Sequence, residues 1–492
     1  MIEDHSGTAR SRLLTLGIVA LPVTYVLTVY LDQGVWITAA ARAASVTALL
    51  AVVIIGIAAV ILRDRRRGAL VGACVIAILS FWHPALALLF ALIAIVIVAD
   101  SLLANRTGRT RPRDVELLHG ALGVFGLLLL FVTVLQFGLR GQIAWVSPAV
   151  SANAPQTDTA PDIWVVLVDG YPRADVLSRE WSYDNGPFVN GLDSLGFFVA
   201  DRSRSNYNAT KMTLASMFNM SLLRDIEPYS QYAKPADAPA ADRVRALLHN
   251  RAFDILRAHG YRITTVAGGY THEELRTADE YIDAGTADVV ELYLVGRSGL
   301  GELLLAFMPE WGERQIRERI EANLATMDRL AADAAGHPRF VYLHIPGPHP
   351  PLVYRQMERR YLAYDRIFEY PVELYGDDLM HEAYRQNIAH LNRIVLDSLT
   401  RLVHTVGHES VVILMSDHGS RTSGILQPLS PDDVEEQFPS LFAARTPDGS
   451  ELFDDEIMTA NVLSTVFNRY LGTGIAPAPS IIETLDGTRY EG

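Results

Sequence analysis

The 492-residue chain is half hydrophobic, with a mean hydropathy of +0.17, yet its formal net charge is −14. Residues 1–140 carry 12 Arg and 7 acidic residues, a net charge of +5, which leaves −19 for the rest of the chain. The acidic remainder argues against nucleic acid as a partner, because phosphate backbones are bound through clustered positive charge.

Four long apolar runs occupy the basic N-terminal part: Leu13–Leu31, Ala43–Leu62, Ala69–Leu103 and Leu117–Leu139. Three of them have about the 20 residues needed to cross a bilayer, but the third has 35 residues with His83-Pro84 near its middle. It is either one kinked helix, which gives four spans, or two helices, which gives five. The only cysteine, Cys74, lies in this run, so the rest of the chain has no disulfide, CxxC zinc site or catalytic thiol.

The positions of the arginines favour five spans. Arg10, Arg12, the Arg63–Arg67 cluster and the 106–113 segment all fall on the cytoplasmic side only if the chain turns at His83-Pro84. The first run is too long and uninterrupted for a cleaved signal peptide. We therefore predict a transmembrane domain over 1–140, a Pro/Ser/Ala-rich linker over 141–161 and an outer domain over 162–492.

The outer domain alternates short β-rich runs with amphipathic stretches. The predicted strands are Ile163–Val168, Phe197–Ala200, Arg262–Val266, Phe340–His344 and Val411–Met415. The predicted helices include Arg243–Arg257, Glu313–Ala335 and His381–His404. This alternation is typical of an α/β domain with a largely parallel sheet, in which the chemistry gathers at the carboxyl ends of the strands.

Two predicted strands run directly into candidate metal ligands. The first ends in Asp169-Gly170, where a buried carboxylate must be hydrogen-bonded or bound to a cation, although Asp169 could instead cap the next helix. The second ends in Asp417-His418-Gly419, and this Asp-His pair suits Zn or Mn beside a phosphoryl or sulfuryl oxygen. The structural alternative is that Asp417 caps a helix and His418 packs in the core.

A third segment, SRSNYNATKMTLASMFNM, is a polar loop that opens a predicted helix from Lys211 to Met220. A hydroxyl at a helix start lies near free N–H groups and the positive helix end, so Thr210 is a candidate nucleophile. The alternative is that Thr210 is only an N-cap. Competing hydroxyls are those of Ser205, Thr213 and Ser216.

Together these segments resemble the alkaline phosphatase superfamily, in its sulfatase-like branch. VDGYPRADVL, the hydroxyl before the SMFN helix, HIPGPHPP at 344–351 and SDHG at 416–419 follow that family's order over about residues 161–480. The resemblance implies that Asp169, Thr210, Asp417 and His418 surround a divalent metal ion and that His349 contacts the transferred or leaving group. His344 is expected to pack at a strand end.

N-terminal spans before such a domain look like lipoteichoic acid synthases and lipid A phosphoethanolamine transferases, whose catalytic domains face outward. The chain lacks the CxPSR-type motif that sulfatases convert to formylglycine, which disfavours sulfate-ester hydrolysis. It also lacks the disulfides that many phosphoethanolamine transferases carry. The expected location is a bacterial plasma membrane, with a multi-pass anchor and an extracytoplasmic catalytic domain.

The resemblance predicts a metal-dependent phosphotransferase. Metal-activated Thr210 attacks the phosphorus of a phospholipid, and an envelope glycan or lipid acceptor then receives the phosphoglycerol- or phosphoethanolamine-like head group. His349 is a candidate general acid. Four basic residues are candidates for holding the anionic substrate: Lys211, Arg202, Arg204 and Arg421. The alternatives are a phosphodiesterase, phosphatase or sulfatase-like hydrolase that uses the same residues, and a catalytically inactive envelope scaffold.

Overall fold

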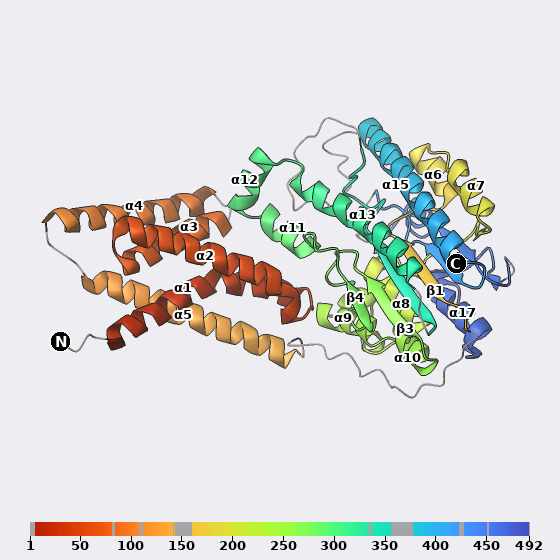
Figure 1. The fold of residues 1–492 in the computed structure, drawn as a ribbon, viewed down its shortest axis with the longest axis horizontal. Coiled ribbons are helices and arrows are strands. Elements are labelled where there is room, and N and C mark those ends of the chain that lie inside the picture. Colours follow the sequence, from red (N-terminus) through yellow and green to blue (C-terminus); the bar gives the residue numbers. More distant parts are fainter. Residues whose placement is uncertain are drawn as a thin grey trace. The chain divides into compact units, whose positions relative to one another are not determined.

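The computed structural model describes residues 5–80, 84–107, 112–140, 142, 160–333, 337–355, 377–422, 428–449 and 452–491. The chain forms two compact units. One unit contains the N-terminal helices together with Val290–Pro309, and the other contains the α/β domain. Figure 1 labels the helices and strands of both units.

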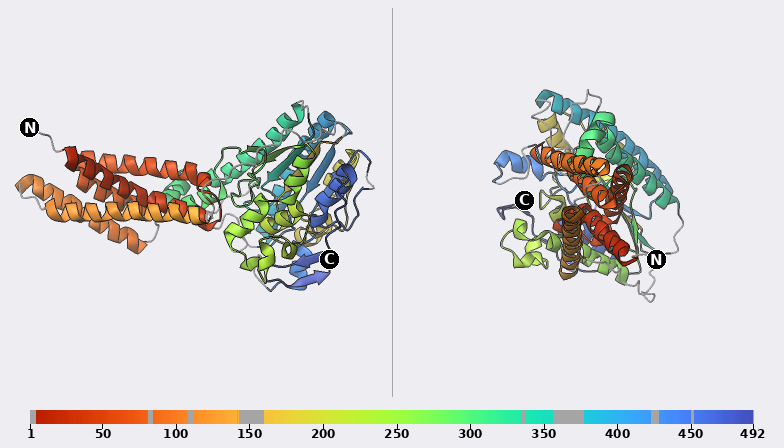
Figure 2. Two further views of the ribbon diagram at one scale, coloured as in Figure 1. Left: turned by 90° about the horizontal axis from the view of Figure 1, so that it is seen from below. Right: turned by 90° about the vertical axis from the view of Figure 1, so that its left-hand side faces the viewer.

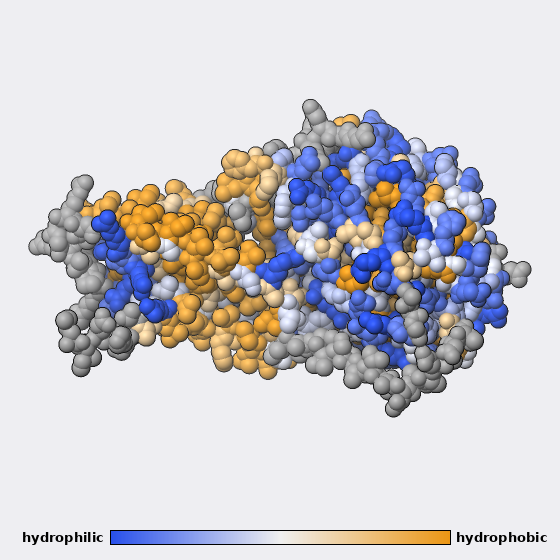
Figure 3. Space-filling view, viewed as in Figure 1, coloured by the Kyte–Doolittle hydropathy of each residue, from blue (hydrophilic) through white to orange (hydrophobic). Residues whose placement is uncertain are grey.

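The N-terminal unit contains five apolar helices: α1 (His5–Asp32), α2 (Ala41–Leu62), α3 (Arg65–Ser80), α4 (Pro84–Thr107) and α5 (Pro112–Leu139). Within the long third apolar run the structure describes two helices, of which one ends at Ser80 and the next begins at Pro84. Among the described residues, four helices are long and apolar enough to cross a membrane, whereas α3 has 16 residues. Most exposed large apolar side chains of the described chain lie on these helices, whose surface in Figure 3 is largely hydrophobic with a band of hydrophilic residues near one end.

Two short helices that follow the strand β4 in the sequence also belong to this unit. These are α11 (Val289–Gly296) and α12 (Gly299–Phe307), and α12 packs against α3. The outer domain predicted over 162–492 includes this segment. The predicted linker lies almost entirely outside the described residues.

The α/β unit is built on a seven-stranded sheet of order β2-β7-β6-β1-β5-β3-β4. Its strands are β1 (Ile163–Val168), β2 (Phe198–Val199), β3 (Arg262–Val266), β4 (Glu280–Ile282), β5 (Arg339–Ile345), β6 (Val411–Met415) and β7 (Phe442–Arg445). Only β7 pairs antiparallel with its neighbours, β2 and β6. The other strand pairs are parallel, which confirms the predicted fold class. A separate hairpin pairs β8 (Ile481–Glu483) with β9 (Arg489–Glu491).

Helices cover both faces of this sheet (Figures 1 and 2). One face packs against α8 (Thr210–Asn219), α10 (Arg251–Ala258) and α17 (Val462–Leu471), through alternate β1 residues such as Val165 and Leu167. The other is covered by α13 (Trp311–Ala332) and α15 (Asp377–Val406), which also pack on each other. Every β1 residue is therefore buried, and for this reason the strand reads as a continuous apolar run.

The remaining helices of this unit are α6 (Ala174–Trp181), α7 (Gly186–Ser194), α9 (Ala240–Leu248) and α16 (Pro431–Gln437). The prediction of a single helix over Arg243–Arg257 is wrong, because α9 ends at Leu248 and a separate helix, α10, begins at Arg251. Asn250 causes the break, since its side chain accepts a hydrogen bond from the Phe253 backbone N–H and starts a new helix. The predicted helices around α13 and α15 are confirmed, although residues 334 and 335 lie outside the described residues.

Candidate active site

The candidate site lies where three parallel strands end side by side. In the register of the sheet, Leu167 of β1 pairs with His344 of β5 and with Met415 of β6. Asp169 follows β1 by one residue, and Asp417 and His418 follow β6 by two and three. Parallel pairing therefore brings residues about 250 positions apart to one edge of the sheet.

The backbone of the loop after β1 forms hydrogen bonds with Asp417 and with His349. The Gly170 N–H donates to Asp417 Oδ1 at 3.0 Å, and the His349 N–H donates to the Asp169 carbonyl oxygen at 3.0 Å. Gly170 has φ +66°, and a Cβ there would lie 3.2 Å from the His418 ring. Both the left-handed backbone and the close contact favour glycine at this position.

Three ligand-type side chains face one another at this edge. One ligand atom each from Asp169, Asp417 and His418 lies within 4.8 Å of the others, and all three residues are buried. His418 Nε2 is 3.2 Å from Asp417 Oδ2 and 3.6 Å from Asp169 Oδ1. Neither of these carboxylate oxygens has a hydrogen-bond partner among the described residues.

The proton of His418 is directed away from this group. His418 Nδ1 lies 2.7 Å from the Gly419 carbonyl oxygen, so Nδ1 carries the proton and Nε2 keeps its lone pair. Burial and then the positive charge of Arg421 lower the pKa of His418 to about 3, so the ring is neutral. Two buried carboxylate oxygens without a hydrogen-bond partner among the described residues thus face the lone pair of a neutral imidazole. This arrangement suits a divalent cation.

Thr210 lies beside this ligand group. It is the first residue of α8, where Ala209 provides no side-chain cap, and its Oγ1 is 3.5 Å from His418 Nε2. The three competing hydroxyls are used elsewhere. Ser205, Thr213 and Ser216 donate to the backbone carbonyls of Phe438, Tyr207 and Ser221, respectively.

His349 and Arg421 form a half-buried pair next to the ligand group. Arg421 donates to His349 Nε2 at 2.7 Å and to the Asn208 carbonyl oxygen at 3.0 Å. His349 Nδ1 lies 2.8 Å from the Pro350 carbonyl oxygen, which assigns the proton to Nδ1. Burial, assisted by Arg421, lowers the pKa of His349 below its usual range, against the opposing charge of Asp169. In this arrangement His349 accepts a hydrogen bond at Nε2 and has no proton there to donate.

The other basic residues predicted to hold substrate have different surroundings. Arg202 is exposed and pairs with Glu456, and Arg204 pairs with Glu435 through both carboxylate oxygens. Lys211 follows Thr210 and faces Glu273. Burial lowers the pKa of Lys211 to about 8, although the Glu273 carboxylate opposes this shift.

Two features of the site were not foreseen from the sequence. His344 Nε2 lies 3.3 Å from Asp169 Oδ2, so this histidine contacts a candidate ligand instead of only filling the strand end. Its pKa is raised, because the hydrogen bond and charge of Asp169 outweigh the lowering effect of burial. The loop after β3 brings Tyr270 against the His344 ring and adds the buried Glu273. Tyr270 and Glu273 could have been found from their position in the loop after β3, which is a third parallel strand of the same sheet.

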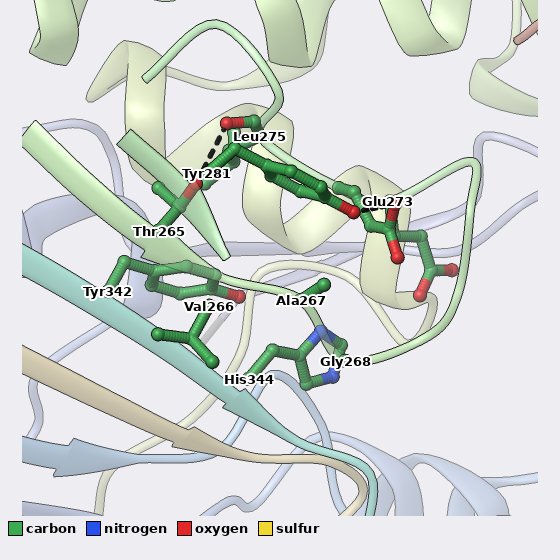
Figure 4. A pocket seen from close by; sticks show the side chains of 10 residues that line it. Thr265, Val266, Ala267, Gly268, Glu273, Leu275, Tyr281, Tyr342 and His344 are labelled. Atoms are coloured by element: carbon green, nitrogen blue, oxygen red, sulfur yellow. Dashed lines mark hydrogen bonds between the residues drawn. The ribbon is translucent and has the colours of Figure 1, made fainter. Parts of the chain in front are cut away.

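A small cavity lies beside His344, between β3, β5 and the loop after β3 (Figure 4). Its polar lining includes Glu273, Glu274 and the hydroxyl of Tyr342, which is buried without a hydrogen-bond partner among the described residues. The cavity is part of the same edge of the sheet as the ligand group.

Solved structures of other proteins match this chain at low sequence identity. No family model matches the chain, and no curated protein matches it. The soluble domain of lipooligosaccharide phosphoethanolamine transferase A from Neisseria meningitidis is 16% identical over 64% of this chain and 89% of its own, with a TM-score of 0.39. The integral membrane form of that protein is 16% identical over 78% of this chain and 68% of its own, also with a TM-score of 0.39.

The phosphonate monoester hydrolase of Agrobacterium radiobacter is 15% identical over 66% of this chain and 75% of its own, with a TM-score of 0.41. A protein described as belonging to the alkaline phosphatase superfamily, from Vibrio parahaemolyticus, is 11% identical over 66% of this chain and 73% of its own, with a TM-score of 0.39. In the order of its motifs this chain resembles the alkaline phosphatase superfamily.

Proposed function

We propose that this protein is a membrane-anchored, metal-dependent phosphotransferase that moves a phospholipid head group to an envelope glycan or lipid through a covalent Thr210 intermediate. One observation carries the proposal. Among the hydroxyl groups of residues 203–220, that of Thr210 lies beside the buried Asp169, Asp417 and His418 group, and Thr210 is the first residue of a helix. The motif order that resembles the sulfatase-like branch supports the same assignment.

The metal would be held by Asp169, Asp417, His418 and the Thr210 oxygen. Two carboxylates, one neutral imidazole nitrogen and a hydroxyl suit Zn or Mn. When bound, the ion would supply Lewis acidity and lower the pKa of the Thr210 hydroxyl. The unpartnered oxygens of Asp169 and Asp417 are the structural reason that the site fits such an ion.

In the first step, Thr210 Oγ1 forms a bond to phosphorus as the bond from phosphorus to the diacylglycerol oxygen breaks. The Thr210 proton is lost, and the departing oxygen takes up a proton to become the diacylglycerol hydroxyl. In the second step, an acceptor hydroxyl attacks the phosphothreonine diester, which frees Thr210 and transfers the head group.

Several residues would act on the phosphate during these steps. The Arg421 guanidinium, fixed by His349 and the Asn208 carbonyl, would hold phosphoryl oxygens. The His349 ring therefore positions Arg421 in the resting site and would accept or return a proton only after Arg421 turns to the substrate. Lys211, at the start of the same helix as Thr210, would add positive charge near the developing oxyanion.

The candidate membrane spans support a lipid-linked donor, a lipid-linked acceptor or both, since they would hold the catalytic domain close to the bilayer. With five spans and the arginine-rich ends inside, the catalytic domain would face outward from a bacterial plasma membrane.

The test is turnover of purified full-length protein in liposomes that contain phosphatidylglycerol and phosphatidylethanolamine with labelled acyl chains. We expect metal-dependent release of labelled diacylglycerol from the wild type and none from Thr210→Ala, with Ser216→Ala as the matched control that loses a hydroxyl from the same helix. Wild-type release that persists in Thr210→Ala would contradict the proposal. Release of free head-group phosphate without any acceptor product would instead indicate the hydrolase.

A further inference from the structure

The segment α11–α12 stands out because its surface is unlike that of the α/β unit. Three exposed large apolar side chains lie at its end: Leu303, Phe307 and Met308, with 49%, 81% and 48% of their surface accessible. Among the described residues of the α/β unit, only Leu379 is a large hydrophobic residue with comparable exposure. All the others lie on the N-terminal helices, whose candidate spans must face lipid.

The charged side chains described in this segment are already neutralised or shielded. Glu291 is paired with Arg42 at the start of α2, and the Arg297 guanidinium lies 4.7 Å from the centre of the Tyr293 ring. Pairing and ring contact lower the cost of placing these two charges next to a hydrocarbon region. The segment therefore presents an apolar surface, and its two charged side chains Glu291 and Arg297 each have a partner.

The Arg42–Glu291 pair also shows which end of the helical bundle the segment occupies. Arg42 is in the first turn of α2, whereas the arginine cluster lies after the last turn of α2 and in the first turn of α3. Since that cluster is expected on the cytoplasmic side, α11 lies at the opposite, outer end. The other helix, α12, packs against α3, which has 16 residues and is only about 24 Å long, shorter than the roughly 30 Å hydrocarbon core.

Neither helix can cross the membrane. At 1.5 Å per residue, the 8 residues of α11 and the 9 of α12 extend about 12 and about 14 Å. Short apolar helices with exposed Leu, Phe and Met side chains at the outer end of a bundle suit the boundary between head groups and acyl chains. Figure 3 shows the apolar surface of α12.

We propose that α11–α12 is an interfacial membrane anchor, in which α12 lies in the outer leaflet with Leu303, Phe307 and Met308 among the acyl chains. The segment begins after β4 at Val289, whose N–H donates to the carbonyl oxygen of Gly269 in the loop after β3. This proposal concerns the contact with lipid and does not depend on the reaction proposed above.

The test uses the fact that Cys74 is the only cysteine. In a Cys74→Ala background, full-length protein carrying Phe307→Cys is spin-labelled and reconstituted in liposomes of phosphatidylethanolamine and phosphatidylglycerol. Collision rates with oxygen, which concentrates in lipid, and with a water-soluble nickel chelate are then measured. Leu89→Cys, exposed on α4, is the lipid reference, and Leu379→Cys, exposed on α15, is the water reference. Leu303→Cys serves as a second reporter if Phe307→Cys does not fold.

We expect an oxygen-to-nickel ratio at Phe307→Cys several-fold above that at Leu379→Cys and closer to that at Leu89→Cys. A ratio equal to that at Leu379→Cys would overturn the proposal, because the side chain would then be in water. Low collision rates with both reagents would also overturn it, because the side chain would then be covered by protein.

Discussion

His344 contacts one oxygen of the buried Asp169 carboxylate and leaves the other oxygen available as a metal ligand. Oδ2 lies 3.3 Å from His344 Nε2, whereas Oδ1 has no hydrogen-bond partner and lies 3.6 Å from His418 Nε2. The hydrogen bond to His344 fixes the carboxylate plane, so Oδ1 is held toward the other ligand atoms. A residue that hydrogen-bonds to a metal ligand in this way orients the ligand and raises the affinity of the site for the metal.

Replacing His344 should therefore weaken metal binding without removing a ligand. We expect His344→Ala to lower zinc affinity by roughly 10- to 100-fold, and His344→Gln to recover part of the loss because its amide can donate to Asp169. The measurement is competition with a fluorescent chelator. His404→Ala, which removes an exposed histidine of α15, should leave the affinity unchanged. Equal affinities for His344→Ala and the wild type would show that Asp169 needs no support.

Removing the metal should destabilise the wild type because two buried carboxylates then face each other's negative charge. Bound metal at 100 times its Kd stabilises a protein by about 2.7 kcal/mol, so a chelator should lower the apparent Tm. Asp417→Asn keeps an acceptor for the Gly170 N–H but loses the ligand charge. We expect this variant to contain no metal and to melt at the same temperature with or without chelator. A chelator-sensitive Tm in Asp417→Asn would place the metal elsewhere.

Substitutions of Arg421 and Arg202 test which of the two arginines binds the phosphate. Arg421→Ala removes a half-buried guanidinium that donates to His349, and charged hydrogen bonds of this kind contribute about 1.5–3 kcal/mol. We expect kcat/KM to fall roughly 10- to 100-fold, since each 1.36 kcal/mol is a factor of ten. Arg202→Ala, which removes an exposed partner of Glu456, should change it less than about twofold. The reverse order would move the substrate toward Arg202.

The low pKa of His418 predicts the pH dependence of the metal-free protein. An unfolded histidine takes up a proton near pH 6.5, whereas folded His418 stays neutral down to about pH 3. Below pH 6.5 the unfolded state therefore binds more protons, and stability falls as the pH falls. Between pH 6.5 and 5 this amounts to about 2 kcal/mol.

Thermal melts of chelated protein at pH 7 and pH 5 measure this effect. The decrease in Tm should be larger for the wild type than for His418→Gln, which has no imidazole at this position. Equal decreases in the two proteins would mean that His418 is protonated in the folded state.

Much of the α/β unit could be predicted from local sequence because its central strands, such as β1 and β6, are buried on both faces and read as continuous apolar runs. The same pattern identified Asp169 and the Asp417-His418 pair, since polar residues directly after such strands stand out. The break at Asn250 was missed, because the apolar spacing continues across it and only the cap interaction interrupts the helix.

Long-range contacts explain the rest. His344 looked like a packing residue until the parallel register of β1 and β5 brought it to Asp169. Nothing local showed that the arginine after SDHG would reach His349, 72 positions away. Likewise, Val290–Pro309 reads as part of the outer domain and joins the N-terminal unit only through tertiary contacts such as the Arg42–Glu291 pair.

The central claim is that Thr210 becomes covalently modified. Peptide mass spectrometry of the metal-replete, full-length protein, incubated with bacterial phospholipids and quenched in acid, tests this most directly. We predict an adduct on the peptide that contains Thr210, with the mass of a phosphoglycerol or phosphoethanolamine group, and no adduct in Thr210→Ala. Lipid turnover with no adduct, or an adduct that persists in Thr210→Ala, would contradict the account.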